Sequence, residues 1–184
     1  LHDALPIYET AYAMGCEAVC FIPTFNNWGW TNPIKNAGIY TWDLWAGAAH
    51  CDTSKGTLVG SVTVVYSGGN VNVTYNVASP YILNETHVYA GTTQFPEVKL
   101  GKKTVYTVAP GQYYIEDNLG DIVYVIAHAV VGIPDPYLVR KRVSLDRHET
   151  SVKRNPQDET WGFSLYQTSH PMSGRATYWL WYCR

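Results

Sequence analysis

The clearest pattern along the chain is a pair of apolar segments joined by a turn signal. Residues 57–66 (TLVGSVTVVY) are rich in β-branched side chains, which favour strands over helices. Residues 71–77 (VNVTYNV) alternate strictly between apolar and polar positions, and residues 67–70 (SGGN) between them are typical of a tight turn. This pattern predicts a β-hairpin with one apolar face.

Other strand-like segments follow one another at short intervals. Residues 39–47 alternate and have one aromatic side, and residues 121–131 carry β-branched side chains on both faces, as a central strand does. About seven or eight short strands separated by turns predict an all-β fold, an antiparallel β-sandwich rather than a βαβ unit. The remaining strands are expected within residues 8–25, 85–91 and 103–115.

The strand pattern ends near residue 132, which sets the expected domain limits. Residues 8–131 are expected to form the β-sandwich domain, whereas residues 132–184 show neither sustained alternation nor a helical stripe. This predicts a poorly structured C-terminal extension, either disordered or frame-shifted, because its six Arg follow 131 residues without any. Residues 1–7 (LHDALPI) resemble a translated adapter remnant and are excluded from the expected fold.

Composition narrows the classes of partner. The formal net charge is −2, which gives no support for a nucleic-acid surface. No run approaches the roughly 18 apolar residues that cross a bilayer, so no membrane span is expected. Phosphate-loop and dinucleotide fingerprints are lacking, and we expect no cofactor. Fifteen Tyr and seven Trp fit a β-rich module that offers aromatic contact area.

The cysteines favour an oxidising, extracellular compartment. Cys51 lies in a turn-like segment between two expected strands, 31 residues after Cys20 and 35 after Cys16. We predict a disulfide from Cys51, with Cys20 preferred to Cys16, and an unpaired Cys183. A catalytic pair of Cys51 with His50 is disfavoured, because adjacent residues of an extended chain point to opposite faces.

An aromatic loop at residues 26–38 (NNWGWTNPIKNAG) is the best candidate for ligand binding. Trp28 and Trp30 offer flat apolar faces, and Asn27 and Asn32 offer amide hydrogen bonds, as in sugar-binding platforms. The alternative interpretation is that one or both indoles plug an end of the sandwich core.

A metal site is a further hypothesis. Glu85 and His87 share one side of an expected strand, and His128 lies on another. If these strands are neighbours, the three side chains, with or without His50, can form a His/carboxylate site. The sequence has none of the HxH, HExxH or CxxC spacings, so hydrogen-bonded or exposed histidines are the competing interpretation.

Enzymatic motifs are otherwise missing, with no GxSxG sequence to mark a serine hydrolase. A glycoside hydrolase with paired carboxylates stays an alternative, because several acidic residues lie in or beside expected strands. These residues are Asp43, Glu85, Glu116 and Asp117.

The series ETAYA, WGWTN, WDLWAGAAHCDTSKGTLVG, ETHVYAG, YTVAPGQY and IVYVIAHAVV resembles an uncharacterised β-rich module of secreted or surface-exposed microbial proteins. The resemblance covers residues 8–131, implies an extracellular location, and carries no catalytic residue. We therefore expect a non-catalytic extracellular binding or structural module that contacts glycans or neighbouring extracellular domains. A secreted hydrolase and a metal-binding surface protein are the alternatives.

Overall fold

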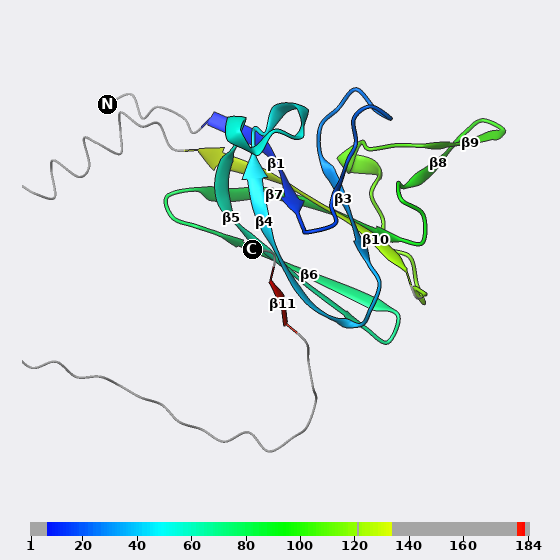
Figure 1. Cartoon of the computed structure of the whole chain (residues 1–184). Coiled ribbons are helices and arrows are strands. Elements are labelled where there is room, and N and C mark those ends of the chain that lie inside the picture. Colours follow the sequence, from blue (N-terminus) through cyan, green and yellow to red (C-terminus); the bar gives the residue numbers. More distant parts are fainter. Residues whose placement is uncertain (1–6, 121, 134–179, 183–184) are drawn as a thin grey trace, which may run out of the picture. The chain divides into compact units, whose positions relative to one another are not determined.

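The computed structural model describes residues 7–120, 122–133 and 180–182 (Figure 1). Most of its strands belong to one nine-stranded sheet, and two further strands form a separate small sheet. No helix among the described residues is long and apolar enough to cross a membrane. The strands are β1 (Ile7–Met14), β2 (Val19–Cys20), β3 (Trp30–Ile34), β4 (Gly38–Ala46), β5 (Thr57–Ser67), β6 (Asn70–Val77), β7 (Ile82–Gly91), β8 (Glu97–Leu100), β9 (Lys103–Tyr106), β10 (Val123–Ile133) and β11 (Leu180–Tyr182).

Strand β10 is the centre of the sheet. Strand β7 pairs with it along one edge, while β1 and β3 pair with successive parts of the other edge. His128 lies opposite His87 of β7 on one side and opposite Tyr12 of β1 on the other. The prediction of a central strand near residues 121–131 is confirmed, because β10 has neighbours on both edges and most of its residues from Val123 to Val131 are buried.

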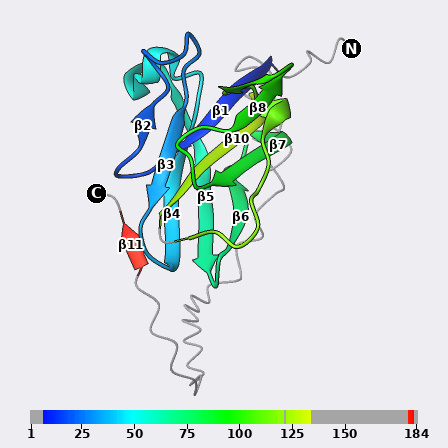
Figure 2. The same cartoon turned by 90° about the vertical axis from the view of Figure 1, so that its right-hand side faces the viewer.

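The main sheet bends so that its last strand, β6, lies against β7 and β10. Its order is β2-β3-β10-β1-β4-β5-β6, with β7 beside β10 and β11 beside β4 (Figure 2). The hydroxyl of Tyr75 on β6 donates to the carbonyl oxygens of His128 (2.9 Å) and His87 (3.3 Å). Strands β4–β6 therefore pack over β7, β10 and β1, which gives the two layers of the expected antiparallel β-sandwich.

Two apolar clusters lie on the opposite faces of β10. Alternate residues of the strand point into the sandwich, where they meet the inner faces of β1, β4, β5, β6 and β7. The intervening residues point outward and are covered by loops. The sandwich cluster includes Leu44, Val62, Val64, Val123, Val125 and Ala127, and the outer cluster includes Tyr12, Phe21, Trp30, Tyr89, Phe95 and Ile126.

The predicted hairpin at residues 57–77 is confirmed as β5 and β6. The turn contains Gly68 (φ 55°) and Gly69 (φ 75°), and both angles lie in the left-handed region that glycine adopts without a steric penalty. The side chains of β6 are alternately half-buried and exposed, as its strict apolar–polar alternation predicts.

Two segments differ from the sequence-based expectation. Residues 26–38 were expected to be a loop, but Trp30–Ile34 form strand β3, which is almost entirely buried between β2 and β10. Residues 103–115 were expected to be strand interrupted by a turn at Pro110–Gly111; the turn is present as a 3₁₀ turn at Pro110–Gln112, but β9 already ends at Tyr106 and no strand follows among the described residues before β10. Pro110 has no N–H to give to a strand ladder, and a turn position suits it.

The disulfide prediction is confirmed for Cys20 and Cys51, whose Cα atoms lie 6.1 Å apart. It links β2 to the 3₁₀ turn at Ala49–Cys51, next to a second turn in which the Asp52 side chain accepts a hydrogen bond from Ser54 N. Closure of a 31-residue loop stabilises a domain by about 3–4 kcal/mol in a chain-entropy estimate. Cys183 lies outside the described residues, as do residues 134–179 of the C-terminal extension.

Candidate functional site

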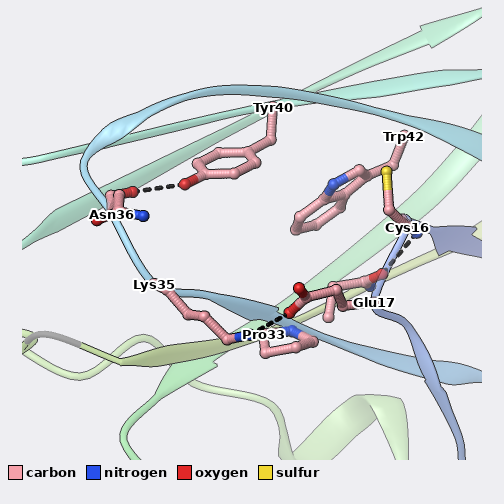
Figure 3. Close-up of a pocket in the computed structure, with 9 residues that line it drawn as sticks. Cys16, Glu17, Pro33, Lys35, Asn36, Tyr40 and Trp42 are labelled. Atoms are coloured by element: carbon pink, nitrogen blue, oxygen red, sulfur yellow. Dashed lines mark hydrogen bonds and ion pairs between the residues drawn. The ribbon is translucent and has the colours of Figure 1, made fainter. Parts of the chain in front are cut away.

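The candidate site is a pocket at the junction of β1, β3 and β4, which we call the β3–β4 pocket (Figure 3). It encloses about 170 Å³ and joins aromatic rings to charged and amide groups. Its lining residues are Gly15, Cys16, Glu17, Asn32, Pro33, Lys35, Asn36, Tyr40 and Trp42.

Tyr40 and Trp42 form the aromatic wall of the pocket. They point to the same side of β4 because they are two residues apart, and their ring centroids lie 6.3 Å apart. The Tyr40 hydroxyl donates to the carbonyl oxygen of Asn36 at 2.6 Å (Figure 3). Burial raises the pKa of Tyr40, so its hydroxyl stays protonated at neutral pH. The hydrogen bond from Tyr40 to Asn36 therefore ties the aromatic wall to the turn that follows β3.

An ion pair forms the polar rim of the pocket. Lys35 Nζ and Glu17 Oε2 lie 2.6 Å apart, and both side chains are exposed. Exposed ion pairs contribute at most about 1 kcal/mol to stability. These two groups can therefore exchange their mutual contact for hydrogen bonds to a bound molecule at little energetic penalty.

The floor of the pocket is built around Asn32, which is almost completely buried. Its Oδ1 accepts from Gly15 N at 2.7 Å, and its Nδ2 donates to the carbonyl oxygens of Ala13 (3.1 Å) and Val125 (3.2 Å). The amide thus ties together β1, β3 and β10. Asn32 was expected to be a ligand contact of an exposed loop, but its amide is engaged in these structural hydrogen bonds.

The other residues of the predicted aromatic site belong to the outer cluster. Trp30 is 3% exposed, while Trp28 is half-buried and Asn27 is exposed. The two indoles meet edge to face, at 77° with centroids 5.8 Å apart, and Trp28 makes a similar contact with Tyr12. Trp28 and Trp30 therefore do not present a coplanar surface, and both pack in the outer cluster, on the opposite face of β10 from the sandwich core.

The structure brings His87 and His128 together. Their Nδ1 atoms lie 3.3 Å apart, and Nε2 of His87 lies 3.3 Å from the Glu85 carboxylate. His128 is 4% exposed and packs against the ring of Tyr12. Burial, together with the nearby His87, lowers the pKa of His128 to about 4. His128 is therefore neutral at physiological pH.

These residues do not converge on one point. Glu85 contacts the ring nitrogen of His87 that faces away from His128, and His50 is exposed in a separate turn. Across residues 7–120, 122–133 and 180–182, no group of three or more His, Cys, Asp or Glu side chains is arranged to hold a metal ion.

The residues considered for catalysis make other contacts or are exposed. Cys51 forms the disulfide, so it has no thiol for the pair with His50. Glu116 accepts hydrogen bonds from the backbone N and the hydroxyl of Thr92, both at 3.0 Å. Asp43 and Asp117 are exposed.

Sequence reasoning found the aromatic side of residues 39–47 but did not assign it to a site. Tyr40 and Trp42 were visible as alternate residues of a strand, whereas Glu17 and Lys35 reach them only through the pairing of β1 and β3 with β10. The usable signal was the polar turn at residues 35–37, directly before the aromatic strand.

Comparison with known proteins gives no relative: no family model, no curated protein and no solved structure matches the chain.

Proposed function

We propose that this chain carries a non-catalytic extracellular binding module whose ligand site is the β3–β4 pocket. The ligand class is a sugar, either free or at the end of a glycan. The observation that supports the proposal is the aromatic wall of Tyr40 and Trp42 directly beside the Lys35–Glu17 rim. Sugars have apolar C–H faces that stack on aromatic rings and hydroxyls that pair with charged and amide groups.

The size of the pocket favours a small ligand. Pockets for drug-sized molecules usually enclose roughly 300–1,000 Å³, and this one encloses about 170 Å³. A single sugar ring or a terminal sugar unit suits such a space better than a long chain lying across it. The Cys20–Cys51 disulfide is compatible with an extracellular setting.

A glycoside hydrolase is the second candidate, because the pocket rim includes one carboxylate. Hydrolysis of a glycosidic bond usually needs two carboxyl groups that flank the bond, and Glu17 is the one acidic side chain among the described residues that line the pocket. Glu17 also forms an ion pair with Lys35, so its carboxylate already has a partner at the rim. Both features favour binding over catalysis.

The proposal is tested by titrating the full chain with a panel of mono- and oligosaccharides in a calorimeter. Tyr40→Ala and Lys35→Ala should each weaken the binding of a sugar ligand roughly tenfold or more, because each removes a direct contact. Tyr106→Ala removes an exposed tyrosine outside the pocket and should leave affinity unchanged. Trp28→Ala tests the aromatic-loop hypothesis in the same titration.

Three outcomes would contradict the proposal. Loss of binding in Trp28→Ala with full binding in Tyr40→Ala would move the site to the outer cluster. Release of new reducing ends from the oligosaccharides, abolished by Glu17→Gln, would show a hydrolase. No heat of binding with any saccharide would leave the module without a sugar ligand.

A further inference from the structure

The β8–β9 hairpin, residues 97–106, exposes large apolar side chains beside lysines. It forms its own two-stranded sheet and extends away from the sandwich (Figure 1). Leu100 at its tip is 72% exposed, and Tyr106 and Val105 are 54% and 37% exposed. Large apolar side chains concentrated on an exposed hairpin are typical of an interaction surface rather than of a folded core.

The register of the hairpin sorts its side chains into two faces. Val98 lies opposite Val105, and Leu100 lies opposite Lys103, so three apolar residues and the aliphatic stem of a lysine share one face. Gly101, with φ 63°, forms the turn directly after Leu100. The tip therefore presents an apolar side chain at the end of an amphipathic ribbon.

Positive charge is concentrated at the same tip. Lys99, Lys102 and Lys103 lie within four residues of one another along the chain. The only other lysines of residues 1–131 are Lys35 and Lys55, in a segment that has no Arg and carries a formal charge of −5. The hairpin is thus a local basic patch on an otherwise acidic module.

We propose that the tip of the β8–β9 hairpin binds the surface of an anionic phospholipid bilayer. Leu100 inserts among the acyl chains close to the headgroups, and the three lysines pair with headgroup phosphates and carboxylates. Interfacial segments bind membranes through this combination of buried apolar area and attraction to anionic lipids. The β3–β4 pocket does not include any residue of the hairpin, so membrane and sugar binding are separate properties.

Two other partners fit the hairpin less well. A second copy of this chain, docked tip to tip, brings like charges together and opposes association. A soluble polyanion pairs with the lysines but makes no use of an exposed leucine between them. The bilayer is the partner that matches both the charge and the apolar character of the tip.

The test is co-sedimentation of the full chain with phosphatidylcholine vesicles that contain or lack about 30% phosphatidylserine. We expect binding to the anionic vesicles and little to the neutral ones, with a decline in affinity as salt is raised. Leu100→Ser, and separately the Lys102→Gln/Lys103→Gln double variant, should each weaken binding roughly tenfold or more.

Matched controls lie elsewhere on the module. Leu58→Ser changes another exposed leucine, which is on β5, and Lys55→Gln changes another exposed lysine. Both should bind vesicles as the unchanged chain does, and circular dichroism should show that every variant is folded.

Equal binding to neutral and anionic vesicles would overturn the proposal. Full binding by Leu100→Ser with loss of binding in the double lysine variant would assign the tip to a polyanion instead. Sedimentation-equilibrium evidence that the hairpin variants lose self-association, without any vesicle binding by the unchanged chain, would assign it to a second copy.

Discussion

At the scale of single residues, His128 is a buried group that stays neutral. Burial lowers its folded-state pKa to about 4, whereas the ordinary value is 6.5. The unfolded chain therefore binds a proton between these pH values and the folded chain does not, so stability falls as pH falls. His87 lies beside His128, Tyr12 packs against the His128 ring, and Glu85 contacts His87 from the other side.

We predict that acidification from pH 7 to pH 4 reduces the free energy of unfolding by about 3 kcal/mol through His128 alone. His128→Gln, which keeps a polar side chain that does not titrate, should remove most of that slope. The measurement is urea unfolding at several pH values. His50→Asn changes an exposed histidine and should keep the original slope. An identical pH dependence in His128→Gln would show that other groups cause it.

Gly15 is a second residue whose identity matters, because a larger side chain at this position would collide with the wall of the β3–β4 pocket. A Cβ atom at this position would lie 2.6 Å from Trp42 Nε1 and 2.8 Å from Trp42 Cδ1. Trp42 is almost completely buried and cannot move away freely. Gly15→Ala should therefore lower the free energy of unfolding by about 1–3 kcal/mol and weaken the binding of any ligand in the pocket.

Thermal unfolding tests this prediction, with Gly111→Ala as the matched control. A Cβ atom at Gly111 meets no neighbouring atom within 4 Å, so this variant should unfold close to the temperature of the unchanged chain. Equal midpoints for the two alanine variants would mean that the indole adjusts without loss of packing.

At the scale of elements, the sequence predicts a strand well where side-chain alternation alone decides it. Residues 71–77 alternate in the way that their burial in β6 requires, and the β-branched run at residues 57–66 becomes β5. Residues 30–34 (WTNPI) contain Asn and Pro, which are typical of loops. They form a strand because they pair with β2 and β10. Asn32 bonds to backbone groups of β1 and β10, and no local pattern contains those partners.

The disulfide is an element-scale constraint on the outer cluster. It ties β2 to the turn before β5, so it holds the covering loops against the outer face of β10. The Cys20→Ser/Cys51→Ser double variant should lose about 3–4 kcal/mol of stability, measured by urea unfolding without reductant. The unchanged chain in reductant should lose a similar amount. A loss below about 1 kcal/mol would mean that the loops are held by packing of the aromatic rings alone.

At the scale of the whole molecule, the β3–β4 pocket and the His87–His128 contact both depend on pairing between strands that are far apart in the sequence. The order of strands in the bent sheet brings Glu17 and Lys35 to Tyr40. The same order places His87 beside His128. The sequence predicted many of the strands and which residues share a face. It did not predict whether the strands of His87 and His128 are neighbours. Strand order could not be derived, because alternation specifies which face a residue occupies and not which strand lies beside it.

The last prediction concerns the C-terminal extension and the limits of the module. Strand β10 continues to Ile133, and among the described residues every member of the two apolar clusters lies before that position. Beyond this point, β11 adds three residues along part of one edge of β4, whose other edge is paired with β5. A chain that ends at Ile133 should therefore remain folded, with a thermal midpoint within a few degrees of the full chain. A fall of about 10 °C or more corresponds to roughly 2 kcal/mol for a domain of this size and would show that the extension contributes to the core.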